Sequence, residues 1–399
     1  MEQVPSARAT RSPLLPIFLI VLVDVLGLTI ILPLLPFYAE HFGASATEVG
    51  MLISTYALCQ LIAGPVLGRM SDHMGRKPLL IVSQLGTLVG FLILAFANSL
   101  WMVFVARVID GLTAGNLSLA QAQISDVTEP ENRARSFGII GIAFGIGFLI
   151  GPAISGFLAQ YSAQYPIFAA AFLSASSVVC TATLLQKATP HADEGDSGPG
   201  GKRLGIFEWG AYAQYFARPE LGRLLLQFFF FAFSFAMLTS GFALFGERRY
   251  HYGVKEVGYV FAWVGLLGII LQGSLMRPLV KMFGERKLVW TGFAGNMVGY
   301  GLLAWSRTLP QLLTATTVSS YGNGVLRPSV TALITHQAGR REQGVVLGLT
   351  QSLTSISQIV APLIAGAMIQ RGWLSAWALG VAAVCLFGLL SSLPKAPSS

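Results

Sequence analysis

Four charged side chains stand inside long apolar stretches of the sequence, where charge is costly. They are Asp24, Arg107, Asp110 and Arg327. At the centre of a membrane span each would cost about 2.5–3.5 kcal/mol, far more than one Leu or Ile contributes to insertion. Such residues are rare at membrane depth and tend to serve a function, so they are the first candidates for chemistry.

Asp24 has the surroundings of a proton carrier. It lies near the middle of an apolar run, with no basic residue one helical turn away. A partly desolvated carboxylate can bind and release protons near neutral pH. The alternative is a structural Asp that is held by hydrogen bonds.

Arg107 and Asp110 are three residues apart, so on a helix they share one face and can pair. One interpretation is a static ion pair that makes insertion tolerable. The other is a switch, in which protonation of an acid or binding of substrate frees Arg107 and biases a conformational equilibrium. Arg327, followed by Pro328, would meet an anionic substrate group or one of the acids, or would extend towards the cytoplasm.

The segments around these residues are long enough to cross a bilayer. Of the 399 residues, 54% are hydrophobic and 11% are charged, against about a quarter charged in soluble domains. Apolar runs of about twenty residues, which cross roughly 30 Å of hydrocarbon, recur throughout. We predict twelve helical spans at 14–38, 48–67, 79–97, 101–124, 136–159, 166–185, 221–245, 257–276, 288–306, 310–334, 344–369 and 373–393.

The spans fall into two groups of six. Residues 187–218 form the longest polar segment, which predicts a linker with a short interfacial helix around Trp209. The predicted domains are therefore 1–186, the linker 187–218 and 219–399. Lys and Arg gather in the linker and in alternate loops, which places the linker and both termini in the cytoplasm. No cleavable signal peptide is evident, because residues 13–38 are too long for one and contain Asp24.

Several function classes are excluded. The net charge of +8 is spread over short loops and does not form the basic stripe of a nucleic-acid binder. Cys59, Cys180 and Cys385 lie in apolar stretches without metal-ligand spacing, so we expect buried thiols and no metal. The sequence contains no phosphate-binding loop and no dinucleotide-binding motif, so we expect no cofactor. An enzyme is disfavoured because no clustered His/Asp ligands or Ser/His pair occur at membrane depth, and a receptor because the linker is too short for a signalling domain.

The two halves also contain similar loop sequences at equivalent positions. The loop after the second span reads GRMSDHMGRKP (68–78), and the loop after the eighth reads RPLVKMFGERK (277–287). Each ends a span, places a Gly before paired basic residues and opens the next span. Such a duplication is typical of secondary transporters, whose substrate site lies between the halves.

The first of these loops resembles the loop signature of the major facilitator superfamily. The residues that match are Gly68, Asp72, Gly75, Arg76 and Lys77. Asp72 can cap the next helix, and the two glycines permit a close helix approach and a tight turn. The resemblance implies a latch on the cytoplasmic side in which the Arg pairs with an acid at the end of span 4, where Asp126 stands. The alternative is a simple positively charged cytoplasmic loop.

Two further motifs resemble those of proton-coupled drug exporters. Span 4 contains RVIDG (107–111), similar to the pattern of proton-coupled members. Span 5 contains GFLIGPAISG (147–156), similar to the antiporter motif, with Gly147, Gly151, Pro152 and Gly156 at the matching positions. Small residues there would let span 5 pack on a helix of the other half, although ordinary glycine packing is the alternative.

From Asp24 through span 6 the chain is most similar to tetracycline/proton antiporters, and the C-terminal half matches the superfamily only loosely. Those exporters have an acid in span 3 that belongs to their drug and proton path. Span 3 here, LLIVSQLGTLVGFLILAFA, has none, which puts tetracycline itself in doubt as a substrate.

Polar residues in other spans are candidates to line a substrate cavity, or else to bridge helices. They are Tyr56, Gln60, Asn116, Gln123, Gln227, Asn323, Gln351 and Gln358, together with Arg327.

These observations predict an all-α major facilitator fold that works by alternating access. We expect a monomer in a bacterial-type cytoplasmic membrane that exports a small amphipathic, drug-like compound in exchange for protons. Asp24 would be the proton carrier, and Arg107 and Asp110 the coupling partners. The alternative is a proton-coupled transporter of an organic anion or sugar, which could work in the uptake direction.

Overall fold

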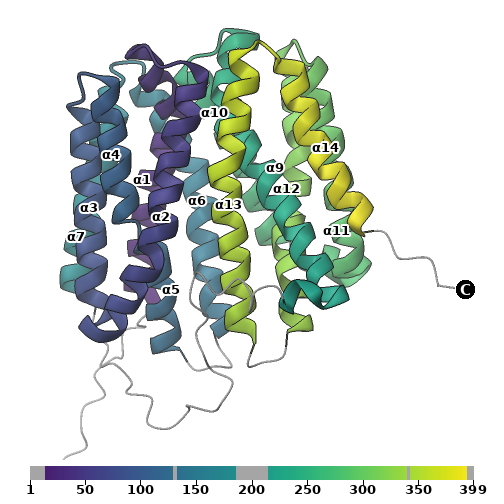
Figure 1. The fold of residues 1–399 in the computed structure, drawn as a ribbon, viewed down its shortest axis with the longest axis horizontal. Helices are drawn as coiled ribbons and strands as arrows, with labels where there is room; N and C mark the ends of the chain where they lie inside the picture. Colours follow the sequence, from purple (N-terminus) through teal and green to yellow (C-terminus); the bar gives the residue numbers. More distant parts are fainter. Residues whose placement is uncertain (1–13, 129–132, 186–213, 339–341, 393–399) are drawn as a thin grey trace, which may run out of the picture.

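The computed structural model describes residues 14–128, 133–185, 214–338 and 342–392, and all regular secondary structure in these ranges is helical (Figure 1). The first half contains α1 (Leu14–His41), α2 (Ala46–Met74), α3 (Arg76–Ala95), α4 (Leu100–Leu112), α5 (Asn116–Val127), α6 (Arg133–Leu158) and α7 (Gln164–Leu184). The second contains α9 (Pro219–Tyr250), α10 (Val254–Ile270), the π-helix η1 (Leu271–Leu275), α11 (Met276–Trp305), α12 (Leu309–Gln337), α13 (Gln343–Gln370) and α14 (Leu374–Ser392). Most of the predicted linker, including Trp209, lies outside the described residues.

The helices cross the membrane twelve times, as predicted. Ten stretches of the described residues are apolar enough to be membrane spans by length and composition. One of them, Val254–Trp305, has 52 residues and is long enough to cross twice, since one crossing takes about twenty. The remaining crossing is α12, a helix of 29 residues whose Ser, Thr, Asn and Arg side chains lower its hydropathy.

The fourth predicted span is not one continuous helix. It is broken between α4 and α5 at Thr113, Ala114 and Gly115. Ser83 of α3 stabilises the break, because its hydroxyl donates to the carbonyl of Thr113 and accepts from the amide of Gly115. The broken backbone is therefore hydrogen-bonded inside the protein, as membrane depth requires.

The matched loops of the two halves adopt the same backbone turn. Gly75, between α2 and α3, has φ 90° and ψ 153°, and Gly284, within α11, has φ 73° and ψ 159°. A positive φ of this kind favours glycine. The internal repeat that the sequence predicts is therefore visible in the backbone, and the second turn lies within the bounds of α11.

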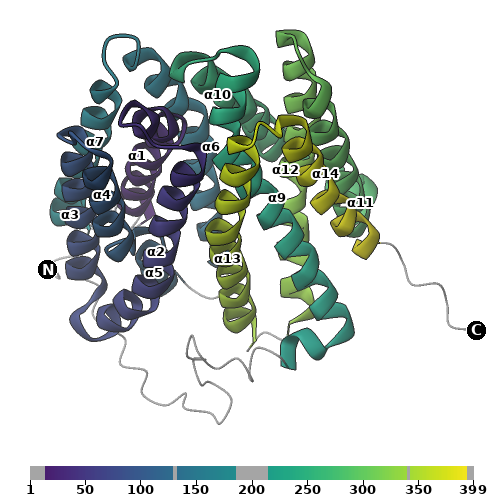
Figure 2. The same ribbon diagram turned by 45° about the horizontal axis from the view of Figure 1, so that its top comes forward.

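The two halves touch at one end and diverge at the other (Figures 1 and 2). We call the end where α7 ends and α9 begins the linker end, and the opposite end, where α1 ends and α2 begins, the far end. Near the far end of α2 and α13, a Cβ at Gly50 would overlap the carbonyl of Pro362, and one at Gly366 would overlap that of Ala46. Towards the linker end, a Cβ at Gly64 or at Gly348 would meet no atom within 4 Å. These two helices therefore separate towards the linker end.

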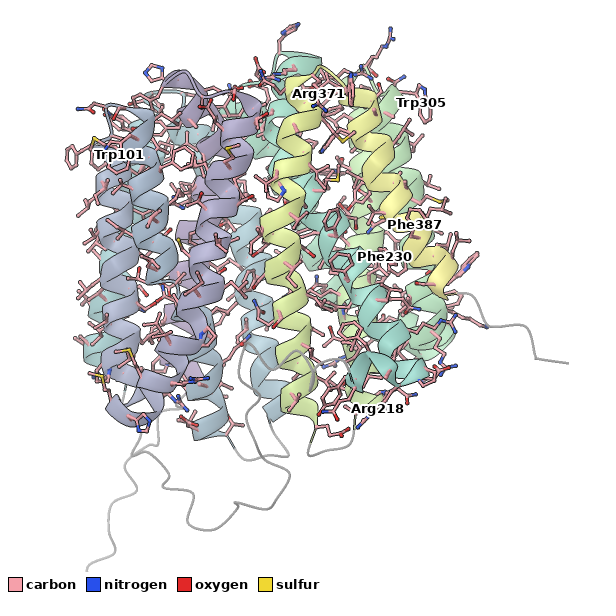
Figure 3. All side chains as sticks on the ribbon, in the orientation of Figure 1. Trp101, Arg218, Phe230, Trp305, Arg371 and Phe387 are labelled. Carbon is pink, nitrogen blue, oxygen red and sulfur yellow. The ribbon has the colours of Figure 1, made fainter. Side chains whose placement is uncertain are left out.

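The outer surface matches a lipid environment. Large apolar side chains are exposed along the helices, for example Phe172 at 72%. Trp101 and Trp305, labelled at the far end in Figure 3, are also mostly exposed. Exposed Trp side chains at this level are typical of the membrane–water interface.

The contact between α6 and α10 generates a stability prediction. A Cβ at Gly258 of α10 would overlap the carbonyl of Pro152 and lie 3.2 Å from the Cα of Gly156, so both obstacles are backbone atoms that cannot rotate away. We expect Gly258→Ala to destabilise the protein by about 1–3 kcal/mol, which thermal unfolding in detergent would measure. Gly268→Ala on the same helix is the control, because a Cβ there meets nothing within 4 Å. Equal unfolding temperatures for the two variants would contradict this account of the contact.

Candidate functional site

A cavity of about 120 Å³ inside the first half brings together most of the charged and polar candidates predicted there. The predicted residues that line it are Asp24, Tyr56, Gln60, Arg107, Asp110 and Asn116, from α1, α2, α4 and α5. Thr87 and Phe91 of α3 and Phe144 of α6 line it as well. Side chains from six helices therefore surround a space smaller than the 300–1,000 Å³ typical of ligand pockets.

Arg107 and Asp110 form the predicted ion pair. The Nη1 of Arg107 lies 3.1 Å from the Oδ2 of Asp110, and their side chains are 5% and 7% exposed. The guanidinium also lies over the ring of Tyr56, at 5.7 Å, and near that of Phe91, at 5.9 Å. Its Nε and Nη2 have no hydrogen-bond partner among the described residues. Since buried donors are normally paired, this guanidinium can donate to a further oxygen atom, such as one of a ligand.

Asp24 is enclosed by polar groups that sequence reasoning missed. Its carboxyl group faces the hydroxyl of Ser177 on α7 and the amide of Gln84 on α3. The Nε2 of Gln84 donates to the Oγ of Ser177 at 2.8 Å, and the Oε1 of Gln84 has no partner among the described residues. The sequence holds a signal for them, because Ser83 and Gln84 stand side by side in a span whose other residues are apolar apart from Thr87. In place of an acid, α3 supplies the amide of Gln84 to Asp24, and α7 supplies the hydroxyl of Ser177.

The break between α4 and α5 shapes the cavity wall. The hydroxyl of Thr113 donates to the carbonyl of Ile109 at 2.8 Å and so satisfies the last turn of α4. A Cβ at Gly86 of α3 would overlap the side chain of Thr113, so glycine permits this close approach. After the break α5 begins at Asn116, which lies at the cavity.

The predicted antiporter motif connects this cavity to the second half. A Cβ at Gly147 would meet Val25 and one at Gly151 would overlap Thr29, so α6 packs against α1 beside Asp24. The hydroxyl of Thr29 also donates to the carbonyl of Gly147 at 2.9 Å. These two glycines therefore pack within the first half and not against the other half.

The end of the motif makes the contact with the other half that the sequence predicts. A Cβ at Gly156 would lie 2.9 Å from the carbonyl oxygen of Lys255 on α10. The carbonyl of Pro152 lies against Gly258, as described above. One helix, α6, thus contacts both the helix of Asp24 and the second half.

Three of the predicted cavity residues lie elsewhere. Gln123 is buried outside the cavity, and in the described ranges its Oε1 has no hydrogen-bond partner. Gln227 donates to the carbonyl of Ser391 at 3.0 Å and so joins α9 to α14. Asn323 accepts hydrogen bonds from Asn296 and Tyr300, both at 3.0 Å, and so joins α12 to α11.

The other three candidates of the second half are exposed. Gln351 and Gln358 lie on α13, on the face that meets α2 nearer the far end. Arg327 is exposed on α12. None of the three lines the cavity of the first half.

The loop after α2 that resembles the family signature forms an ion pair and several hydrogen bonds within the first half. The Nε of Arg76 lies 2.8 Å from the Oδ2 of Asp126, as predicted, and its Nη1 donates to the Oγ of Ser71 at 2.5 Å. Lys77 donates to the carbonyls of Ala182 and Leu185 at 2.7 Å each. The tight turn predicted at Gly75 is present.

Gly68 and Asp72 of this loop do not confirm the prediction. The close helix approach predicted at Gly68 is absent in this conformation, because a Cβ there would meet no atom within 4 Å. The side chain of Asp72 lies outside the part of the chain that the structure describes. Among the described residues, no group of three or more His, Cys, Asp or Glu side chains could hold a metal ion.

Comparisons with known proteins extend the resemblance to both halves. The Major Facilitator Superfamily profile matches residues 17–282 and 274–399. The tetracycline resistance protein of class B from Escherichia coli is 30% identical over 93% of this chain and 93% of its own length. The quinolone resistance protein NorA from Staphylococcus aureus is 26% identical over 86% of each chain. The similarity therefore extends past span 6 through the second half, which is further than the sequence motifs predicted.

A solved structure supports the same fold. The human organic anion transporter MFSD10 has a TM-score of 0.72 and 22% identity, and the match covers 98% of this chain and all of that one. The predicted fold is confirmed, with its twelve crossings in two related halves. The chain belongs to the major facilitator superfamily of membrane transporters.

Proposed function

We propose that this protein exports a small amphipathic, drug-like compound in exchange for protons. The observation that supports it most is the convergence of Asp24 with the Arg107–Asp110 pair on one cavity at membrane depth. Relatives that are tetracycline and quinolone resistance proteins agree with a drug-like substrate. Since α3 has no acid, we leave the drug class open.

We further propose a monomer in a bacterial-type inner membrane, with both termini in the cytoplasm. Lys and Arg gather in the loops at the linker end, among them Arg69, Arg76, Lys77 and Lys287. Positively charged loops stay in the cytoplasm, so the linker end faces it. The separation of α2 and α13 towards that end then corresponds to an inward-facing state.

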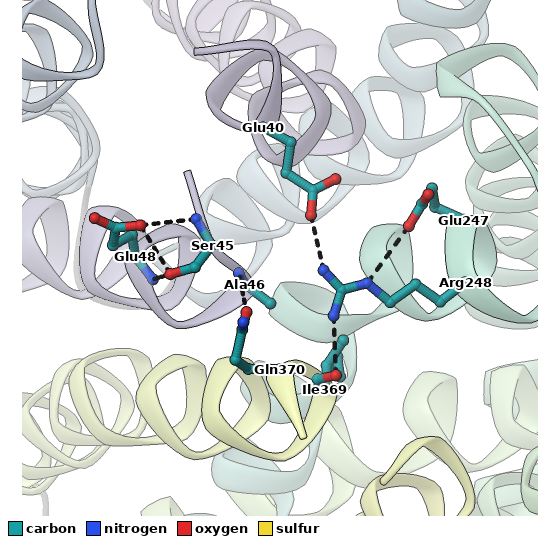
Figure 4. A network of polar contacts seen from close by, with 8 residues as sticks. All are labelled: Glu40, Ser45, Ala46, Glu48, Glu247, Arg248, Ile369 and Gln370. Carbon is teal, nitrogen blue, oxygen red and sulfur yellow. Dashed lines mark hydrogen bonds and ion pairs between the residues drawn. The ribbon is translucent and has the colours of Figure 1, made fainter. Parts of the chain in front are cut away.

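The far end supplies the closed gate of that state. In the described residues three hydrogen bonds join the halves. The amide of Ala46 donates to Gln370 at 2.8 Å, Ser54 donates to the carbonyl of Ile359 at 2.6 Å, and Arg248 donates to Glu40 at 3.1 Å. Figure 4 shows the first and third of these, with Arg248 also held by the carbonyl of Ile369. All three must break before the far end opens.

The proposed cycle couples this gate to the charge of Asp24. A protonated Asp24 is neutral and tolerates enclosure by α1, α3 and α7, whereas the carboxylate attracts the nearby free donors of Arg107. Substrate that binds at the cavity competes for those donors and favours proton release. Because α6 contacts both α1 and α10, a shift at Asp24 reaches the interface between the halves. A ligand shifts this equilibrium by its difference in affinity for the two states.

The first test removes the proton from the cycle. Asp24→Asn keeps the size and hydrogen-bonding of the side chain but cannot titrate. In proteoliposomes we expect pH-driven drug flux to be lost, while drug binding and drug/drug exchange without a pH gradient persist. Glu285→Gln, an acid at the linker end, is the control and should behave as wild type. Unchanged pH-driven flux in Asp24→Asn would show that Asp24 is not the proton carrier.

The second test separates the charge of Arg107 from its structural role. Asp110→Asn leaves a buried guanidinium without its partner, so we expect destabilisation of about 3–5 kcal/mol in thermal unfolding. The double variant with Arg107→Gln removes both charges and should recover most of the stability, yet it should not recover pH-driven flux. Recovery of coupling in the double variant would show that the pair is purely structural.

The third test loosens the far-end gate. Glu40→Gln removes one charge of an ion pair whose side chains are 30% and 23% exposed, so we expect a modest effect of about 0.2–1 kcal/mol. That is up to roughly a fivefold shift towards the outward-facing state, measured as the distance between spin labels on far-end loops of the two halves. Glu48→Gln is the control, because Glu48 caps its own helix at Ser45. An unchanged distance distribution in Glu40→Gln would remove this pair from the gate.

A further inference from the structure

Arg327 is a charged residue that the site in the first half does not use. It lies on α12 about ten residues from the linker end of that helix, a depth of roughly 15 Å. Asp24 lies about as deep in α1 of the other half. An arginine at this depth calls for a partner or a function.

The helix face of Arg327 points into the protein. Thr316 and Ser320 lie two or three turns towards the far end on the same face, and Ile334 lies two turns towards the linker end. These three residues are buried, at 5%, 4% and 0% exposed. Arg327 itself is exposed. Its side chain therefore occupies an opening on an inward face, not a lipid-facing surface.

No acid of the second half neutralises it. This half contains no Asp, and its Glu residues stand at or near helix ends. Glu220 pairs with Arg286, Glu247 with Arg248, Glu285 with His336 and Glu342 with Arg218, while Glu256 accepts from the amide of Gly253. Arg327 makes no hydrogen bond or ion pair with any described residue.

The two acids that lie at membrane depth in the described part of the first half are also engaged. Asp110 pairs with Arg107, and Asp24 faces Ser177 and Gln84. Extension of Arg327 to the membrane surface would have to cover roughly 15 Å of helix, which exceeds the reach of its side chain. The N–H donors of the guanidinium therefore have no acid partner among the described residues. Their planar arrangement matches the two oxygens of a carboxylate.

We propose that Arg327 binds an acidic group of the transported compound, so that the preferred substrates are amphipathic carboxylates or similar anions. This inference rests on the proposed function and names its substrate class. The anionic end meets the second half, while the proton site lies in the first half at about the same depth. Proton exchange and substrate recognition are thereby divided between the halves.

The test compares binding of a matched pair of probes. An amphipathic fluorescent carboxylic acid and its methyl ester differ in charge but little in shape. We expect the purified full-length protein to bind the acid at least about tenfold more tightly, in line with a charge-assisted hydrogen bond. Arg327→Gln should abolish this preference and leave ester affinity unchanged, whereas Arg327→Lys should retain part of it. Arg307→Gln, an exposed arginine just before α12, should keep the preference in full.

The outcomes separate this inference from the proposed function. Asp24→Asn should keep the acid preference even where it loses pH-driven flux. Equal binding of acid and ester by the wild type, or a preference that survives in Arg327→Gln, overturns the inference without touching proton coupling. Loss of flux for both probes in Arg327→Gln, with the binding preference intact, also overturns it, because Arg327 would then be a counter-ion of the cycle. Unfolding temperatures of Arg327→Gln and Arg327→Lys identify any variant that fails to fold.

Discussion

The structure depends on one constraint, which is that hydrocarbon offers no water to a charge. Arg107 and Asp110 meet it by pairing within one face of α4. Tyr56 and Phe91 add their rings to the guanidinium. Because the two charges neutralise each other, α4 can remain at membrane depth. The helix is broken just after this pair, and Ser83 stabilises the break. Two donor atoms of the guanidinium have no partner among the residues that the structure describes, and this leaves the pair able to respond to protons and ligands.

Glycine determines how such a response can travel. Gly147 and Gly151 bring α6 against α1 beside Asp24, and Gly156 brings the same helix against α10. Gly147 and Gly151 contact the β-branched side chains of Val25 and Thr29, and Gly156 contacts backbone atoms of Lys255. Neither kind of neighbour can adjust much, so a displacement of α1 is passed on instead of being absorbed. The same close packing recurs where α2 meets α13 near the far end. Helices that are this close move as rigid bodies, which suits a protein that alternates between two states.

The two halves share a backbone but not a chemistry. Gly75 and Gly284 make the same turn at equivalent loops. The first half holds both membrane-depth acids, whereas the second offers an unpaired arginine and a network of Asn296, Tyr300 and Asn323 that joins α11 to α12. The two halves are thus similar scaffolds, and the different charged residues within their spans give them different electrostatic roles.

The sequence alone determined the spans, the division into halves and the Arg107–Asp110 pair, because hydropathy and helical spacing are local properties. It also indicated the pairing of Arg76 with Asp126 through a loop motif. The tertiary structure decided which polar residues meet. Gln84 and Ser177 reach Asp24 from α3 and α7, whereas Gln227 and Asn323 bridge helices. Spacing along one helix predicts a shared face, but which neighbour that face meets depends on packing between helices distant in sequence.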